Sequence, residues 1–132
     1  MPLKLKQFLN ELLEVMEEDY QQQLQEIIKD ARGITCLQTL DNEKAVIQID
    51  RRRIKISSKA PKKQINVHIT LSRNCLFEIL EGRITLEQAF YSKELEVLGD
   101  PATLLRCYRI WERIMSLART SARITFLTYR LR

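Results

Sequence analysis

The chain has 132 residues, of which 45% are hydrophobic and 30% charged, with a formal net charge of +5 at pH 7. This length and composition are typical of one globular domain with a single hydrophobic core. No apolar run approaches the roughly 20 residues of a membrane-spanning helix, and acidic residues stand where a signal peptide would be apolar, so we expect a cytoplasmic protein. The three cysteines are widely spaced and follow no metal-ligand or disulfide pattern, and we expect neither a metal nor a cofactor.

Charge is divided unevenly along the chain. Residues 1–33 hold four basic and seven acidic side chains, whereas the remaining residues hold 18 basic and 10 acidic ones. Seven of the basic side chains lie between Arg51 and Lys63. This segment contains no aromatic residue on which a nucleic-acid base could stack, so we interpret it as a solvated turn and expect no nucleic acid. Contact with anionic lipid headgroups is a second interpretation.

The first 32 residues have the pattern of an amphipathic helix. Apolar residues recur at intervals of three and four from Leu5 to Ala31, and Gly33 stands where a C-terminal cap is expected. An unbroken helix of this length would measure about 45 Å, longer than a small domain needs. We therefore predict a break near residues 18–21 and treat residues 1–19 as an additional N-terminal helix.

Five segments have the pattern of β-strands. Residues 34–40 and 45–50 predict a hairpin, and residues 53–57 a third strand before the polar loop 57–63. Strict alternation from residue 65 to 71 predicts the fourth strand, and residues 95–99 the fifth. Alternation implies that one face of the sheet is buried and the other is exposed to water.

Each helix of the C-terminal half begins at a recognisable cap. Ser72 precedes the helix that Gly82 ends, and Thr85 with Gln88 has the spacing of a capping box. Asp100 followed by Pro101 predicts the start of a long apolar helix. We expect the arginines of this helix to lie on the side opposite its apolar stripe.

The sequence contains no pattern of catalytic residues. The single histidine, His68, lies on the polar side of its predicted strand without a partner at motif spacing, and we interpret it as an exposed polar residue. Paired carboxylates, nucleophile and base sets and glycine-rich phosphate loops are also missing. We expect a protein that is not an enzyme.

The order of these features resembles the sterol carrier protein 2 (SCP2) family of lipid-binding domains. The resemblance is carried by HITLSRNCLFEILEGRITLEQAFYSKELEVLGDPATLLR, residues 68–106. It extends over about residues 20–117, leaving residues 1–19 and the basic amphipathic extension 118–132 outside the family pattern. One departure is Lys93, where the family has a glycine in a tight turn, and we expect that turn to take another shape.

The resemblance implies an α+β fold, in which a five-stranded, mostly antiparallel sheet carries helices on one face around an apolar tunnel. It also implies non-enzymatic binding, and potentially transfer, of a sterol, fatty acid, acyl-CoA or phospholipid. Apolar cavities with few polar groups are the usual form of such sites. The candidate ligand-binding residues, each of which is also a plausible core residue, are Phe77, Leu80, Leu86, Phe90, Leu98, Leu104, Leu105, Tyr108 and Trp111.

Two alternatives concern the ends of the chain. Some members of the family support lipid or quinone biosynthesis by presenting intermediates to enzymes, and the acidic N-terminal helix is a candidate surface for a protein partner. The tail after Leu117 alternates arginine with apolar residues. It is interpreted either as a segment that packs back on the domain, or as a lid or element that contacts an anionic membrane.

Overall fold

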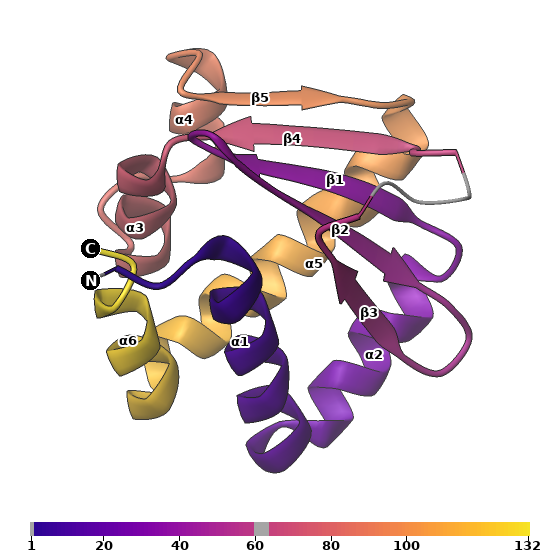
Figure 1. The fold of residues 1–132 in the computed structure, drawn as a ribbon, viewed down its shortest axis with the longest axis horizontal. Helices are drawn as coiled ribbons and strands as arrows, with labels where there is room; N and C mark the ends of the chain where they lie inside the picture. Colours follow the sequence, from indigo (N-terminus) through magenta and orange to yellow (C-terminus); the bar gives the residue numbers. More distant parts are fainter. Residues whose placement is uncertain (1, 60–63) are drawn as a thin grey trace.

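A computed structural model describes residues 2–59 and 64–132, so residues 60–63 of the predicted polar loop lie outside the described residues. The fold is an α+β arrangement in which a five-stranded sheet carries helices on one face (Figure 1). The elements in chain order are α1 (Leu5–Asp19), α2 (Gln21–Ala31), β1 (Thr35–Leu40), β2 (Glu43–Ile49), β3 (Ile54–Ser57), β4 (Val67–Leu71), α3 (Arg73–Glu81), α4 (Leu86–Tyr91), β5 (Leu95–Leu98), α5 (Pro101–Thr120) and α6 (Ala122–Tyr129).

The sheet has the strand order β3-β2-β1-β4-β5. Only β1 and β4 pair in parallel; the other three pairs are antiparallel, which confirms the mostly antiparallel prediction. β1 is therefore the central strand, and its residue Gln38 pairs with Ala45 of β2 and Ile69 of β4. Because side chains alternate between faces, these three residues share the face that the helices cover.

The predicted break in the N-terminal helix is confirmed. Tyr20, with φ −136° and ψ 48°, separates α1 from α2. The apolar side of α1 is buried, with Phe8 fully enclosed, so this helix belongs to the same hydrophobic core as the sheet. Its acidic C-terminal end is paired within the domain, because Arg123 of α6 binds Glu18 at 2.8 Å and Asp19 at 3.2 Å.

The three predicted caps are confirmed. The side chains of Ser72, Thr85 and Asp100 accept hydrogen bonds from backbone N–H groups three residues on, at 3.0, 3.0 and 3.1 Å. These bonds satisfy donors that a helix leaves without partners in its first turn. The caps fix where α3, α4 and α5 begin.

The tail after Leu117 packs back on the domain. α5 continues to Thr120, and α6 buries Ile124 and Leu127 in the common core. The backbone N–H of Leu3 donates to the carbonyl of Arg130 at 2.8 Å, so the two ends of the described chain lie side by side (Figure 1). In the described residues no helix is both long and apolar enough to cross a membrane.

The turn between α4 and β5 corrects one expectation. Lys93 adopts the left-handed conformation that glycine favours, with φ 67°. The N–H of Glu94 donates to the carbonyl of Ala89 at 3.0 Å and closes the turn in the manner of a helix C-terminal motif. The expectation that lysine would change the shape of this turn is therefore wrong, because the hydrogen bonds of the turn hold its backbone in this conformation.

Lys93→Gly should raise the free energy of unfolding by about 0.5–1.5 kcal/mol. The left-handed conformation costs a residue with a Cβ about 1–2 kcal/mol, and the added freedom of glycine in the unfolded chain offsets part of the gain. Urea denaturation of the variant measures the change. Glu94→Gly is the matched control: Glu94 has no positive φ, so glycine there should lower the free energy of unfolding. Equal losses of stability in the two variants would contradict the prediction for Lys93.

Candidate functional site

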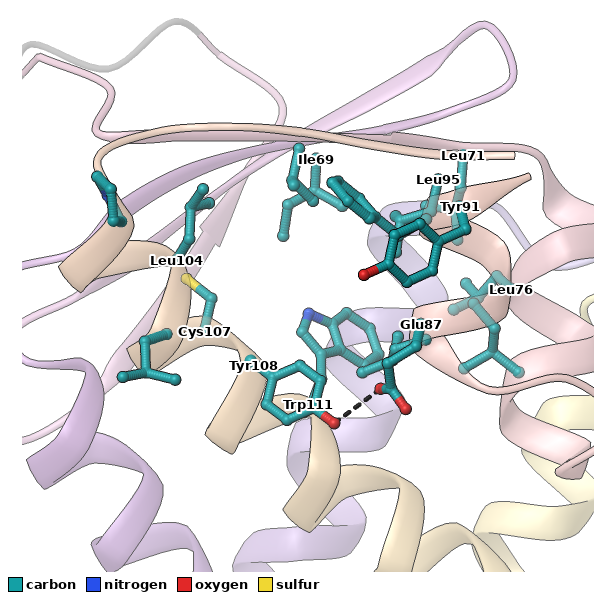
Figure 2. Close-up of a pocket in the computed structure, with 16 residues that line it drawn as sticks. Ile69, Leu71, Leu76, Glu87, Tyr91, Leu95, Leu104, Cys107, Tyr108 and Trp111 are labelled. Atoms are coloured by element: carbon teal, nitrogen blue, oxygen red, sulfur yellow. Dashed lines mark hydrogen bonds between the residues drawn. The ribbon is translucent and has the colours of Figure 1, made fainter. Parts of the chain in front are cut away.

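An apolar pocket lies between the sheet and helices α3, α4 and α5 (Figure 2). Its volume is about 400 Å³, and we call it the outer pocket. Strands β4 and β5 supply one wall through side chains of the covered face, and α5 supplies the opposite wall. The lining residues are Ile69, Leu71, Leu76, Ile79, Leu86, Glu87, Phe90, Tyr91, Leu95, Val97, Pro101, Leu104, Leu105, Cys107, Tyr108 and Trp111.

Glu87 is the only charged side chain among these lining residues. The hydroxyl of Tyr108 donates a hydrogen bond to Oε1 of Glu87 at 2.7 Å, which is the dashed line in Figure 2. This hydrogen bond raises the pKa of Tyr108 to about 12, so the hydroxyl remains a neutral donor at physiological pH. The pair links α4 to α5 across the pocket.

The entrance of the outer pocket carries apolar side chains that remain in water. Phe90, Tyr91, Leu105 and Tyr108 are 36–81% exposed, and all four line the pocket. Exposed large apolar groups gathered at one place mark a surface that binds a ligand, a membrane or another protein. We call these four residues the rim.

Helix α5 is only loosely covered on its apolar side. Of its 20 residues, Cys107, Leu117 and Ala118 alone are fully buried, whereas Leu104 and Trp111 are half-buried and line the pocket. Polar contacts also hold the helix. Arg106 donates to the carbonyls of Asp30 at 2.8 Å and Arg32 at 2.6 Å, and Arg113 pairs with Asp30 at 3.1 Å. These contacts join α5 to α2, beside the cavity that lies between α5 and the sheet.

A second, smaller pocket of about 100 Å³ lies beyond the first. This inner pocket shares Ile69, Cys107 and Trp111 with the outer one. None of its described lining residues is charged, and only Gln38 carries an amide. The lining residues are Leu9, Leu12, Leu13, Met16, Ile27, Ile34, Cys36, Gln38, Ile47, Ile49, Ile54, Ile56, Ile69, Cys107, Ile110, Trp111 and Ile114.

The cysteines give the pockets no reactive group. Cys36, Cys75 and Cys107 are free and buried. Burial raises the pKa of Cys36 to about 12, with a smaller contribution from Cys107, and burial also raises the pKa of Cys107. Thiols in this state are protonated and are weak nucleophiles. Among the described residues, no group of three or more His, Cys, Asp or Glu side chains could hold a metal ion.

The structure brings six of the nine candidate residues into the outer pocket and leaves three outside it. The six are Leu86, Phe90, Leu104, Leu105, Tyr108 and Trp111. Leu98 pairs with His68 on the uncovered face of the sheet and is 68% exposed. The alternation of β5 requires this, because Leu95 and Val97 already occupy the covered face.

Phe77 and Leu80 lie on the other side of α3, where they face the C-terminal helix and tail. The Phe77 ring is 5.8 Å from that of Tyr129, and the guanidinium of Arg132 lies 3.9 Å above it. Leu80 lines a separate pocket of about 240 Å³ together with Ala118 and Tyr129. α6 thus supplies a second packing surface for α3, which the pattern of α3 alone does not reveal.

Of the ten lining residues that sequence reasoning missed, four come from the covered face of the sheet and six from helices α3, α4 and α5. Ile69, Leu71, Leu95 and Val97 all line the outer pocket. Their alternation marks them as inward-facing, so this signal was available in the sequence. No residue after Trp111 lines the outer pocket, so the described tail does not form a lid over it.

Comparisons with known proteins agree with this architecture. The model of the SCP-2 sterol transfer family matches residues 9–111, starting within α1 and not at residue 20 as expected. A search of curated protein sequences finds no significant match. A search of solved structures finds several with the same fold.

Three of these structures resemble most of the chain. The sterol carrier protein domain 2 of Helicoverpa armigera is 16% identical, with a TM-score of 0.62, and the match covers 83% of this chain and 87% of that one. Apo sterol carrier protein 2 from Yarrowia lipolytica is 20% identical, with a TM-score of 0.58 and coverage of 84% and 89%. A UbiJ-SCP2 ubiquinone synthesis protein is 14% identical, with a TM-score of 0.56 and coverage of 75% and 78%.

At these identities the structural matches establish a common fold. The family model covers most of the chain, including every strand and the part of α5 that lines the outer pocket. The chain therefore belongs to the SCP-2 sterol transfer family.

Proposed function

We propose that this domain binds a single hydrophobic lipid in the outer pocket, without catalysing a reaction on it. The observation that carries the proposal is the position of α5, whose apolar side lines a cavity of about 400 Å³ where a helix would ordinarily pack on the sheet. This volume lies in the range of about 300–1,000 Å³ that is usual for small-molecule sites. Burial contributes about 0.8 kcal/mol for each CH₂ group, so an alkyl chain alone supplies the driving force.

The rim supports exchange of the lipid with a surface. Phe90, Tyr91, Leu105 and Tyr108 would contact the acyl region of a membrane or the apolar entrance of another protein while the ligand passes between them. Transfer between membranes requires only such transient contact. Sterols, fatty acids, acyl-CoA and phospholipids all satisfy the apolar requirement of the pocket.

The test is a titration of the protein with dodecanoate, in which the fluorescence of Trp111 reports binding. This residue is the only tryptophan of the chain and lines the pocket, so its emission should change when the alkyl chain enters. Val97→Phe places a ring in the cavity and displaces about two CH₂ groups of the ligand, which should weaken binding about 10- to 50-fold. Leu98→Phe is the matched control on the next residue, whose side chain lies on the uncovered face, and it should bind as the unaltered protein does.

Mass spectrometry of lipids extracted from the purified protein complements the titration. We expect a co-purified lipid that Val97→Phe reduces. If the protein is empty and neither dodecanoate nor cholesterol changes the Trp111 emission, the proposal is wrong.

A second candidate function is presentation of a lipid or quinone intermediate to a biosynthetic enzyme. The exposed rim favours it, since an enzyme could cover these side chains as well as a membrane could, and the likeness to a ubiquinone synthesis protein is compatible with it. The apolar side of α1 is buried, so a partner that binds α1 would have to use its exposed polar side. Transfer of a bound lipid between protein-free vesicles favours the first candidate, and delivery only to an enzyme favours the second.

A further inference from the structure

The inner pocket contains a polar side chain without a partner. Gln38 is only 2% exposed, and neither the nitrogen nor the oxygen of its side-chain amide has a hydrogen-bond partner among the described residues. Buried side-chain amides in folded proteins are nearly always hydrogen-bonded, because burial removes their bonds to water. The amide of Gln38 therefore requires an explanation.

The neighbours of Gln38 form no hydrogen bond with its side-chain amide. On the covered face of the sheet Gln38 stands between Ala45 and Ile69. The other lining residues of the inner pocket are apolar, and the three that carry a weak or single donor, Cys36, Cys107 and Trp111, do not bond to the amide. An apolar residue would pack here without loss. The position is thus unfavourable for glutamine in the protein alone, which is typical of a residue whose partner is a ligand.

The inner pocket adjoins the outer one at a wall of three side chains. Ile69 extends from the sheet toward Trp111 and Cys107 of α5, and all three line both pockets (Figure 2). Trp111 is only half-buried, so its ring is not fixed by close packing on every side. An alkyl chain that enters at the rim and passes between Ile69 and Trp111 would reach the inner pocket.

We propose that the lipid extends past Trp111 and ends in the inner pocket with a hydroxyl group bound to the amide of Gln38. This inference rests on the proposed function and adds the chemical class of the ligand. A hydroxyl donates one hydrogen bond and accepts others, which matches an amide that offers both a donor and an acceptor. The last torsion of glutamine is broad, so either amide atom can turn toward the ligand.

A carboxylate is excluded from the inner end by its charge. No described lining residue of the inner pocket is charged, and a carboxylate buried there would lose its hydration without gaining a cation. A fatty acid therefore binds with its methyl end inside and its carboxylate at the rim. An alcohol binds the opposite way, with its hydroxyl inside.

The experiment compares dodecan-1-ol, dodecane and dodecanoate on the unaltered protein and on Gln38→Met, with Trp111 emission as the signal. Methionine keeps the length of glutamine but cannot form these hydrogen bonds. The preference for dodecan-1-ol over dodecane should fall about 3- to 10-fold in the variant, the usual effect of one net hydrogen bond. The affinity for dodecanoate, like that for dodecane, should not fall in the variant. Gln38→Leu should reduce the preference for dodecan-1-ol by the same factor as Gln38→Met.

Gln25→Met makes the same chemical change on the exposed side of α2 and should leave all three affinities unchanged. If Gln38→Met leaves the preference for the alcohol unchanged, the hydroxyl does not reach the inner pocket and this inference is wrong, whereas binding itself stands. A water molecule that satisfies Gln38 in place of the ligand gives that same result. If none of the three compounds binds the unaltered protein, both the inference and the proposed function fail.

Discussion

Phe8→Ala should lower the free energy of unfolding by about 3–5 kcal/mol, the usual cost of removing a buried phenylalanine ring. Phe8 is fully enclosed, and α1 covers part of the sheet together with Leu5, Leu12 and Met16. Small domains are stable by only about 5–15 kcal/mol, so this single change removes a large share of the total. Urea denaturation with linear extrapolation measures the loss.

Lys6→Ala is the control on the exposed side of the same helix, and its effect should stay within about 0.5 kcal/mol. The comparison also decides whether α1 is a separate docking helix or a part of the hydrophobic core. If α1 served only to bind a partner, Phe8→Ala would leave the free energy of unfolding nearly unchanged, and deletion of residues 2–19 would leave a stable domain. We expect the deletion to unfold the protein instead, because α1 contributes six buried residues to the common core.

Arg73→Met should cost about 2–4 kcal/mol of unfolding free energy, because one side chain joins the two ends of the chain to the sheet. Its Nη1 donates to the carbonyls of Leu3 at 2.5 Å and Leu131 at 3.2 Å, and its Nη2 forms an ion pair with Glu43 of β2. The side chains of this pair are 21% and 27% exposed. The variant leaves two carbonyls without the donors of Arg73 and a half-buried carboxylate without its cation, although Glu43 still accepts from the N–H of Leu5 at 3.2 Å. The partial exposure moderates the loss.

Arg130→Met provides the control, because Arg130 pairs with Glu11 at 3.0 Å but the two side chains are 56% and 38% exposed. Its cost should not exceed about 1 kcal/mol. Arg73→Lys should recover only part of the lost stability, since an ammonium group cannot reproduce the fork of donors of a guanidinium. Equal costs for the Arg73→Met and Arg130→Met variants would show that Arg73 does not join these segments.

Local chemistry made much of the fold predictable. The break near Tyr20, the caps at Ser72, Thr85 and Asp100, and the alternation of the strands depend on neighbours within a few residues, so the sequence carries them directly. The same local logic failed at Lys93. The hydrogen bonds that close the turn outweigh the preference of lysine for a right-handed backbone.

The candidate site was predictable only in part, because a residue pattern states which side of an element is apolar but not what that side faces. Leu104 and Phe77 both belong to apolar stripes; one lines the outer pocket and the other packs against the C-terminal tail. Which of the two occurs depends on the placement of α6 and on the contacts from Arg106 and Arg113 to α2.

The strands, the helices up to α5, the covered face of the sheet and the resemblance to the family could be predicted from the sequence, since each follows from spacing along the chain. Only the three-dimensional arrangement reveals the cavity between α5 and the sheet, the meeting of two pockets at Trp111, and the burial of Gln38 with no hydrogen-bond partner among the described residues. These features depend on distances between elements far apart in the chain, which no local spacing encodes.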